Sequence, residues 1–353
     1  MGRSPLRRSG NRPCTGRGVR WAGTIRVPAG AGRSTRSAAA SSWIEESAII
    51  VESEESGAVP GFSAGSIACG IKKGRKRDLT LIVSKTPAVV AGVFTRNRVK
   101  AAPLLLTMER VKGGRCGAVI INSGNANACT GKRGMRDAVR MAGEAAKALG
   151  VEPEEVLVAS TGVIGEPLPV DRIIKGVPRL AKRVSSSLAG WRDAAEAIMT
   201  TDTFPKLVQE EGVICGTPIS ILGVAKGSGM IAPDMATMLA FFVTDAAIEQ
   251  SELQSVLRSA VKRSFNRITV DGESSTNDTV LLLANGAAGN GRVRAGSSGL
   301  KQFSKMVERI CVQLATLIVK DGEGATKFLE IRVKGAKSEG EAVKAARRIA
   351  NSL

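Results

Sequence analysis

The residues that could carry chemistry lie in the segment 226–242, KGSGMIAPDMATMLAFF, where small and flexible residues precede one threonine, Thr237. A threonine hydroxyl is a poor nucleophile near neutral pH unless a base takes its proton. The chain contains no histidine, so a catalytic triad cannot supply that base. Cutting the bond between Ala236 and Thr237 would free an α-amino group, whose pKa of about 8 suits a general base. Small Ala236 and the flexible Gly-Ser-Gly stretch at 227–229 would allow the strained turn that self-cleavage needs.

The same segment also has a purely structural interpretation. MATMLAFFV fits a buried strand with one inward-facing threonine. On these residues alone the structural interpretation is favoured, because a short match of this kind occurs often by chance. Thr237 is therefore a candidate nucleophile that needs support from the rest of the chain.

Composition excludes several other kinds of site. The six cysteines are scattered, with no C-x-x-C pair, which is typical of reduced thiols in an intracellular protein and predicts a cytoplasmic location. Without histidine, most catalytic zinc sites are also excluded. Neither a phosphate-binding G-x-x-x-x-G-K-[ST] loop nor the G-x-G-x-x-G spacing occurs. We expect no metal, no nucleotide cofactor and, since no apolar run reaches about 18 residues, no membrane span.

The net charge of +19 raises the question of a nucleic-acid partner. Residues 1–44 hold nine of the 51 basic residues and no acid, so the rest of the chain carries only +10. That charge is scattered, apart from clusters such as KKGRKR at 72–77, and has no aromatic residues interleaved. We expect no nucleic acid, because an acidic small molecule explains the charge equally well. A basic nucleic-acid-binding protein is the non-enzyme alternative.

Residues 1–44 are rich in Arg, Ser and Gly and have no apolar periodicity, which predicts a disordered extension. Two origins are open. A transit peptide would direct the protein to a plastid or mitochondrion. Translation upstream of the true start is slightly favoured, because all nine basic residues are Arg. In both cases we expect deletion of the segment to leave folding unchanged.

From about residue 58 the pattern is globular. Apolar runs that end in turn residues predict buried strands, and amphipathic segments between them predict helices. The irregular alternation favours an α+β layered fold over a doubly wound nucleotide fold. Capping boxes are predicted at Ser251 with Gln254 and at Ser338 with Glu341. The predicted strands are 79–85, 117–124, 156–162, 279–284 and 327–335, and the predicted helices are 135–150, 251–265, 299–318 and one from about 338.

Several long motifs, in order, resemble the bifunctional ornithine acetyltransferase / glutamate N-acetyltransferase family of arginine biosynthesis. The similarity runs from about residue 59 to the end, and the family usually has Asn where this chain has Asp234. It also usually has DGDTSTND for DGESSTND, and neither change touches Thr237. The resemblance implies a layered αββα-type sandwich of the N-terminal-nucleophile-like kind. The motifs are KGSGMIAPDMATMLAFFVTDA, GIKKGRKRDLTLI, AGVFTRNRVKAAP, INSGNANACTG, STGVIG, TTDTFPK, DGESSTND and DGEGATKF.

The resemblance implies self-cleavage between Ala236 and Thr237, giving an α chain that comprises 45–236 and a β chain of 237–353. Thr237 then takes the acetyl group from N2-acetyl-L-ornithine and passes it to L-glutamate, in a ping-pong cycle with an acetyl-threonine intermediate. No resident cofactor is implied, although some members also use acetyl-CoA as donor. The implied assembly is a heterotetramer of two α chains and two β chains.

The resemblance also assigns site residues. Thr161 and Gly162 of STGVIG would stabilise the oxyanion. Lys226 would supply a cation for a substrate carboxylate and Glu323 an anion for an amino group. The implied substrate contacts are Thr203, Lys226, Thr237 and Glu323.

Family members continue beyond IANSL through a segment that completes the substrate pocket. The resemblance therefore implies a truncated β chain, for which we expect self-cleavage to persist and acetyl transfer to be poor until a family-like C-terminal segment is added. A second enzyme hypothesis is a related N-terminal-nucleophile aminopeptidase or other hydrolase, in which water replaces glutamate as acceptor. Transfer of acetyl groups to glutamate separates the two.

Overall fold

The computed structural model describes residues 21–30, 49–50, 58–231, 238–291 and 293–352. The predicted cleavage site, Ala236 and Thr237, lies outside the described residues. The strands are β1 Trp21–Gly30, β2 Ile49–Ile50, β3 Phe62–Ile67, β4 Leu79–Phe94, β5 Arg115–Asn125, β6 Val156–Val163, β7 Lys206–Ile214, β8 Thr217–Lys226, β9 Leu239–Thr244, β10 Thr279–Ala284 and β11 Ala325–Ala336. The helices are α2 Ala102–Val111, α3 Gly131–Leu149, α4 Val170–Ala181, α5 Leu188–Ile198, α6 Gln250–Arg263, α7 Ser298–Lys320 and α8 Glu339–Ala350, with 3-10 turns at Pro153–Glu155 and Phe265–Arg267.

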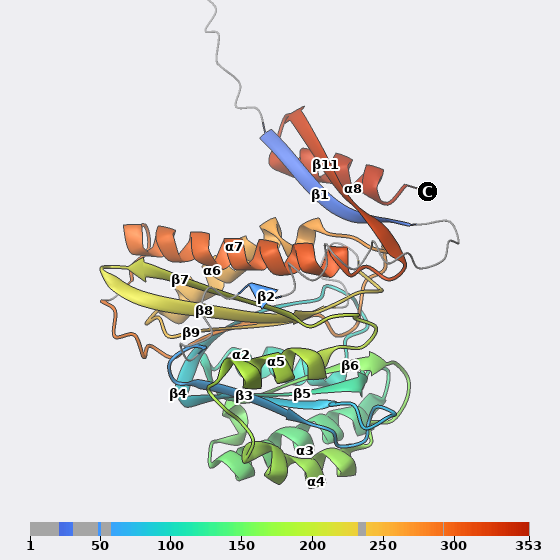
Figure 1. Ribbon diagram of the computed structural model, residues 1–353, viewed down its shortest axis with the longest axis vertical. Coiled ribbons are helices and arrows are strands. Elements are labelled where there is room, and N and C mark those ends of the chain that lie inside the picture. The colour runs from blue at the N-terminus through green and yellow to red at the C-terminus, as the bar shows by residue number, and fades with distance from the viewer. Residues whose placement is uncertain (1–20, 31–48, 51–57, 232–237, 292, 353) are drawn as a thin grey trace, which may run out of the picture.

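Most strands belong to one nine-stranded mixed sheet with the order β2-β7-β8-β9-β10-β4-β5-β6, and β3 pairs with β4 beside this path. β4 is long enough to take part in both sheet layers. Its first half pairs with β3 and β5, and its second half, Val89–Phe94, pairs with β10. Figure 1 shows the resulting layers, with β7, β8 and β9 above β3, β4, β5 and β6 and with α5 between them.

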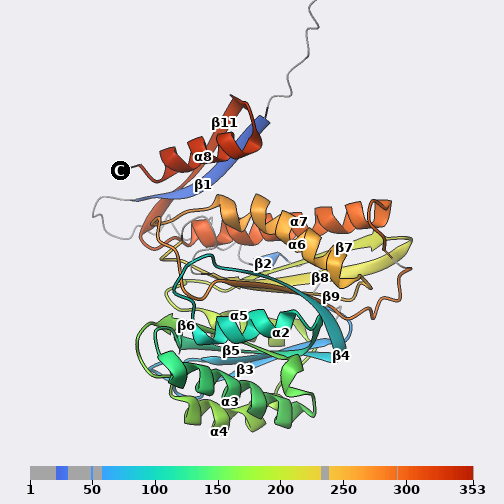
Figure 2. The same ribbon diagram turned by 180° about the vertical axis from the view of Figure 1, so that it is seen from behind.

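Helices cover both outer faces of the layered sheet. α6 and α7 lie on the β7–β9 side, and α3 and α4 lie on the β3–β6 side (Figures 1 and 2). Three apolar cores result, marked by Phe242 with Phe303 on the first side, Trp191 of α5 in the middle, and Leu81 with Met141 on the second side. The layered α+β sandwich predicted from the sequence is confirmed, and α5 is enclosed between its two sheet layers.

β9 and β10 form a parallel pair at the centre of the sheet. Every residue of both strands is buried. A strand that is covered on both faces shows a continuous apolar run rather than alternation, which explains the sequences LAFFVT and TVLLLA. The backbone after residue 237 therefore leads directly into the middle of the sandwich.

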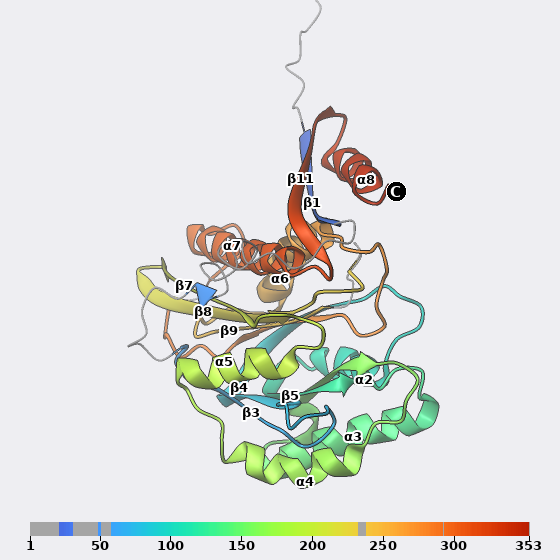
Figure 3. The same ribbon diagram turned by 45° about the vertical axis from the view of Figure 1, so that its right-hand side comes forward.

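The prediction that residues 1–44 have no regular structure is wrong for Trp21–Gly30. This segment forms β1, which pairs antiparallel with β11. β11 projects beyond α6 and α7 together with α8 (Figure 3), so its edge offers unpaired backbone groups. Pairing through backbone hydrogen bonds does not require an apolar pattern, so no periodicity in residues 21–30 indicated this strand.

At one of the two predicted capping boxes the structure shows the expected serine cap. The Ser338 hydroxyl accepts the Glu341 N–H at 3.2 Å at the start of α8. α6 instead begins at Gln250 without a side-chain cap. The Gln254 side-chain amide accepts the Gly92 N–H at 3.1 Å and donates to the Gly92 carbonyl at 3.0 Å. It therefore connects α6 to β4 rather than capping the helix.

Candidate active site

A cavity of about 820 Å³ opens where β6 and β8 end and where the loop before β10 meets the end of α7. Such a volume suits a small amino-acid derivative. Four of the residues assigned from the sequence line it: Thr161, Gly162, Lys226 and Glu323. The other lining residues are Ile71, Lys72, Lys73, Lys76, Gly124, Ala126, Val163, Ile164, Glu166, Thr200, Thr201, Ser228, Gly229, Met230, Ser275 and Asn277.

Thr161 and Gly162 lie at the end of β6, beside the parallel strand β5. Thr161 is buried, and its hydroxyl lies 3.4 Å from the Lys226 ammonium. Gly162 has a φ of 132°, and a Cβ built there would lie 2.3 Å from the carbonyl carbon of Gly124. Only glycine allows the two strand ends to approach this closely. The predicted oxyanion residues therefore lie at a backbone position with little freedom.

We expect Gly162→Ala to abolish acetyl transfer and to lower the melting temperature, because the new methyl group collides with backbone that cannot move aside as a side chain would. Gly165→Ala is the matched control. Gly165 also has a positive φ, 88°, but nothing lies within 4 Å of its built Cβ, so it carries only the backbone strain of about 1–3 kcal/mol. Thermal unfolding and transfer assays on both variants check this, and equal behaviour of the two would contradict it.

Lys226, the last residue of β8, is almost fully buried in the cavity wall. Its ammonium donates to the Thr200 hydroxyl at 2.7 Å and lies 4.0 Å from Asp202 Oδ2. Burial lowers the pKa of Lys226, and the charge of Asp202 opposes that shift. The cation is thus held beside the predicted oxyanion residues.

A buried ion-pair network holds this part of the wall in place. The Lys206 ammonium lies between Asp202 Oδ1 at 2.8 Å and Asp321 Oδ2 at 2.5 Å. Burial alone would raise the pKa of Asp202, but Lys206 and Lys226 hold it well below its usual range. Asp202 also accepts the Gly227 N–H at 2.7 Å. The network therefore fixes the backbone on which Lys226 lies.

The structure does not bring Thr203, predicted as a substrate contact, to the cavity. Its hydroxyl donates to Asp321 Oδ1 at 2.5 Å, and its N–H donates to the same carboxylate. Thr200, in the same TTDTFPK motif, lines the cavity and accepts from Lys226. The sequence pattern could not distinguish these threonines, because only the turn between α5 and β7 decides which side chain faces inward.

Glu323 follows α7 and approaches the 227–229 loop. Its N–H donates to the Ser228 carbonyl at 2.9 Å, and its carboxylate lies so close to Gly229 that a Cβ there would be 2.6 Å from Oε2. The Ser228 hydroxyl in turn donates to the Asp321 carbonyl at 2.6 Å. The cavity therefore contains both a cation, Lys226, and an anion, Glu323. The hydrogen bonds of Ser228 connect the loop after Lys226 to the segment that carries Glu323.

The three lysines of the basic segment 72–77 line the cavity, whereas Arg77 forms exposed ion pairs elsewhere. Four consecutive backbone N–H groups, from Cys69 to Lys72, donate to the Asp78 carboxylate at 2.6 to 3.0 Å and shape the loop. Burial lowers the pKa of Lys72 to about 8, with Asp78 opposing the shift. Lys73 and Lys76 also line the cavity. The rim is therefore positively charged and suits anionic substrates.

Asn277 is a further residue of the site that carried no assigned role. Its amide donates to the Ala126 carbonyl at 2.7 Å and to the Ser160 carbonyl at 2.8 Å. It thereby connects the DGESSTND loop to the ends of β5 and β6. The only sequence signal was the presence of Asn277 in a motif shared with the family.

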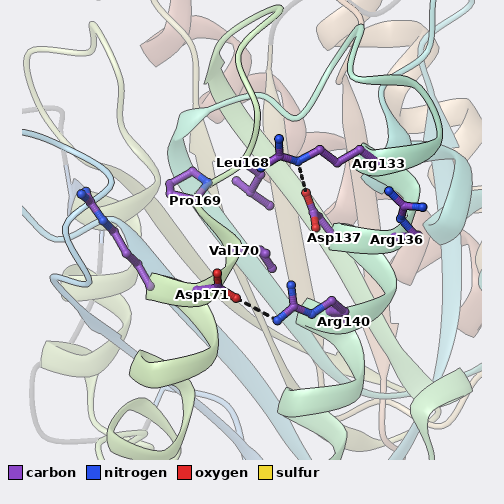
Figure 4. Close-up of a pocket in the computed structure, with 9 residues that line it drawn as sticks. Arg133, Arg136, Asp137, Arg140, Leu168, Pro169, Val170 and Asp171 are labelled. Atoms are coloured by element: carbon purple, nitrogen blue, oxygen red, sulfur yellow. Dashed lines mark hydrogen bonds and ion pairs between the residues drawn. The ribbon is translucent and has the colours of Figure 1, made fainter.

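A second hollow of about 620 Å³ lies between α3 and the start of α4 (Figure 4). Arg133 lies 3.7 Å from Asp137, and Arg140 lies 2.8 Å from Asp171. Paired charges on an exposed surface contribute little, and none of the residues assigned from the sequence line this hollow. The larger cavity, which four of the assigned residues line, is therefore the candidate active site.

The residues that the structure describes also lack two other features. They include no helix that combines the length and the apolar character needed to cross a membrane. They also include no group of three or more His, Cys, Asp or Glu side chains arranged to hold a metal ion.

The sandwich and its cavity, together with the family match, define an acyltransferase of arginine biosynthesis. The model of the ArgJ family matches residues 63–353, and the chain belongs to that family.

Two relatives of similar sequence support this assignment. The arginine biosynthesis bifunctional protein ArgJ of Geobacter sulfurreducens is 54% identical over 294 residues, which are 83% of this chain and 74% of that protein. The protein of the same name from Symbiobacterium thermophilum is 53% identical, over 83% of this chain and 73% of its own. A crystal structure of ornithine acetyltransferase from Mycobacterium tuberculosis, complexed with ornithine, is 39% identical over 52% of this chain and 96% of that chain, with a TM-score of 0.46.

Proposed function

We propose that this chain cleaves itself between Ala236 and Thr237 and then transfers acetyl groups from N2-acetyl-L-ornithine to L-glutamate. The observation that carries the proposal is the single cavity in which Lys226 and Glu323 present opposite charges beside the glycine-ended strand β6. Both substrates are amino-acid derivatives that carry a carboxylate and an amino group. A cation and an anion in one cavity match that chemistry.

In the proposed cycle, the Thr237 hydroxyl attacks the acetyl carbonyl while its own α-amino group takes the proton. Thr161 and Gly162 stabilise the oxyanion, and the proton passes to the departing nitrogen of ornithine. Glutamate then attacks the acetyl-threonine, its surplus proton returns to the Thr237 hydroxyl, and N-acetylglutamate leaves. Lys226 lies 3.4 Å from the Thr161 hydroxyl, so it also increases the positive potential where negative charge develops.

We further propose that no resident cofactor takes part, because the threonine and its amino group supply both nucleophile and base. The lysine-bearing rim accommodates a larger anionic donor, so acetyl-CoA is the donor to test beside N2-acetylornithine. The proposed assembly is a heterotetramer of two α chains and two β chains in the cytoplasm. Native mass measurement of the cleaved protein tests the assembly.

The activity is tested by following N-acetylglutamate formation from N2-acetylornithine and glutamate, for which a ping-pong cycle gives parallel double-reciprocal lines. In this assay we expect Glu323→Gln to raise the KM for N2-acetylornithine about 10- to 100-fold, because a charge-assisted hydrogen bond is worth about 1.5–3 kcal/mol. The effect on kcat should be smaller, since Glu323 contacts the bound substrate in ground and transition states alike.

Glu109→Gln is the control for this variant, because Glu109 is an exposed carboxylate that pairs with Lys112 and does not line the cavity. It should leave both constants unchanged. Release of free acetate without N-acetylglutamate would favour the hydrolase and contradict the transferase. If the KM of Glu323→Gln were unchanged, Glu323 would not be a substrate-binding residue.

A further inference from the structure

The two amino acids of the proposed reaction carry opposite charges on their side chains. Ornithine ends in an ammonium group and glutamate ends in a carboxylate, whereas the α-carboxylate is common to both. In the proposed ping-pong cycle the two amino acids occupy one cavity in turn. Lys226 supplies a cation for the shared α-carboxylate and Glu323 an anion for an amino group. The side-chain carboxylate of glutamate therefore needs a further cation.

Lys72 is the cation of the cavity that suits this role. It belongs to the loop between β3 and β4, which contributes three lysines to the cavity lining. Lys73 and Lys76 are exposed, whereas Lys72 is half-buried. Water and salt screen exposed charges strongly and half-buried charges less. Lys72 is therefore the lysine of this loop that would stabilise a substrate carboxylate most.

Two backbone carbonyls orient the Lys72 ammonium. It donates to the carbonyl of Arg77 at 3.0 Å and to the carbonyl of Ala197 at 2.9 Å. These bonds use two of its three N–H donors. Among the described residues Lys72 forms no direct ion pair, since Asp78 and Asp202 lie beyond ion-pair distance of its ammonium. A fixed cation with its charge not directly paired is pre-organised to bind a carboxylate.

Glycines allow the Lys72 side chain to approach the end of β6. Gly124, near the end of β5, has a φ of 99°, and a Cβ built there would lie only 3.1 Å from Lys72 Cγ. Gly124 in turn lies against Gly162, whose built Cβ would be 2.3 Å from the Gly124 carbonyl carbon. The lysine side chain therefore crosses the strand ends that carry the predicted oxyanion residues.

We propose that Lys72 binds the side-chain carboxylate of glutamate, an inference that rests on the function proposed above. In this arrangement Lys226 binds the α-carboxylate that both substrates share, and Glu323 binds the side-chain ammonium of ornithine. Lys72 thereby selects glutamate as the acetyl acceptor over amino acids whose side chains are uncharged.

The electrostatic surroundings of Lys72 suit a site that receives both charges in turn. Burial lowers the pKa of Lys72 to about 8, and Asp78 and Asp202 oppose that shift. The like charges of Lys226 and Lys76 lower the pKa further. A nearby ornithine ammonium favours the neutral lysine, and a glutamate carboxylate favours the charged form. Lys72 can exchange a proton with water between the two half reactions, so it tolerates the first substrate and attracts the second.

Lys72→Met tests the inference, because it removes the charge and keeps a side chain of similar length. The variant is assayed with N2-acetyl-L-ornithine as donor and with either L-glutamate or L-glutamine as acceptor, since glutamine has nearly the same shape without the charge. We expect the ratio of kcat/KM for glutamate to kcat/KM for glutamine to fall about 10- to 100-fold. In a ping-pong cycle kcat/KM for the donor reports only the first half reaction, so it should stay within about twofold of the parent value.

Arg77→Met is the matched control, because it removes one positive charge from the same loop. The Arg77 side chain forms ion pairs with Asp193 and Glu196, at 3.1 and 2.8 Å, and does not line the cavity. Its backbone carbonyl, which accepts from Lys72, is unchanged in the variant. The glutamate-to-glutamine ratio of Arg77→Met should equal that of the parent.

The pH dependence of the parent's selectivity gives a second test that needs no variant. Both acceptors carry the same α-carboxylate and the same attacking amino group, so the titration of Lys226 and of that amino group largely cancels in the ratio. The ratio should be constant up to about pH 8 and should then fall about tenfold per pH unit as Lys72 loses its proton. The charged groups that surround Lys72 are Asp78, Asp202, Lys226 and Lys76 and, in the cavity lining, Lys73, Glu166 and Glu323.

An unchanged glutamate-to-glutamine ratio in Lys72→Met would overturn the inference. Equal losses with both acceptors would also overturn it, because they would leave Lys72 with a structural role. A fall of the ratio in Lys73→Met but not in Lys72→Met would place the carboxylate at the exposed rim instead. A parent ratio that stays constant between about pH 7 and about pH 9.5 would overturn the inference even if the variant failed to fold. If the parent transfers no acetyl group to either acceptor, the proposed function itself fails, and the two failures are therefore distinguishable.

Discussion

Replacing Thr237 by alanine is expected to leave the protein as one uncut chain that transfers no acetyl groups. In the proposed mechanism the same hydroxyl attacks the Ala236 carbonyl during cleavage and the acetyl carbonyl during turnover, so its loss should remove both reactions. Without the nucleophile the covalent route is closed, and the expected fall in transfer is at least about 10⁴-fold, within the range seen when a nucleophile is removed. Intact mass measurement and the N-acetylglutamate assay check the two parts separately.

Thr237→Ser is the companion variant, because it keeps the hydroxyl and removes only a methyl group. It should retain partial cleavage and partial transfer. Detection of Thr237→Ala as two chains divided at residues 236 and 237 would refute the mechanism, since no other residue is proposed to attack that bond.

The second large effect is expected from Lys206→Met, which removes the cation between Asp202 and Asp321. Both carboxylates would then be buried without their partner, and breaking such a pair costs about 3–5 kcal/mol of folding free energy. Lys112→Met is the control, because its pair with Glu109 is exposed to solvent and should contribute less than about 1 kcal/mol. Chemical denaturation of both variants measures the difference.

The effect should depend on pH in a definite direction. The pKa of Asp202 is held below its usual range in the folded protein, so its ion pairing stabilises the fold above the ordinary aspartate pKa of about 4. That contribution is lost as the pH falls from this value toward the lowered folded pKa. The difference in the free energy of unfolding between the parent and Lys206→Met should therefore become smaller toward pH 3. The prediction would be contradicted if this difference did not change with pH. It would also be contradicted if Lys206→Met were as stable as Lys112→Met.

The sequence predicted the layered sandwich because its signals were local. LTLIVSK, GAVIINSG and TVLLLA are apolar runs in which most residues are buried, and each lies within a strand of the structure. The end of α3 and the start of α8 were also predictable, because each depends on a local residue. Gly150 ends α3 in a left-handed conformation, and the Ser338 side chain caps the start of α8. β7 and β8 were not predicted, since residues such as Glu210 and Ser220 interrupt their apolar pattern.

Residues of the candidate site could be predicted only where they belong to a motif shared with the family. Thr161, Gly162, Lys226 and Glu323 were assigned through the family resemblance, and the structure brings all four to one cavity. The contact of Lys206 with Asp321 spans 115 residues, and no local pattern reports such a pairing. Thr200 was missed for the same reason, because its role depends on where the Lys226 side chain lies in space.

The strand order has a consequence for the protein after it has been cut. β9 and β10 belong to the predicted β chain, yet they lie between β8 and β4 of the predicted α chain. Once the link at residues 236 and 237 is broken, the two pieces cannot separate without dismantling the middle of the sheet, and once separated they must find each other by diffusion. Recovery from denaturant should then depend on protein concentration, whereas the uncut chain regains its structure at any dilution. Maturation would therefore give this enzyme a fold that it assembles efficiently only once.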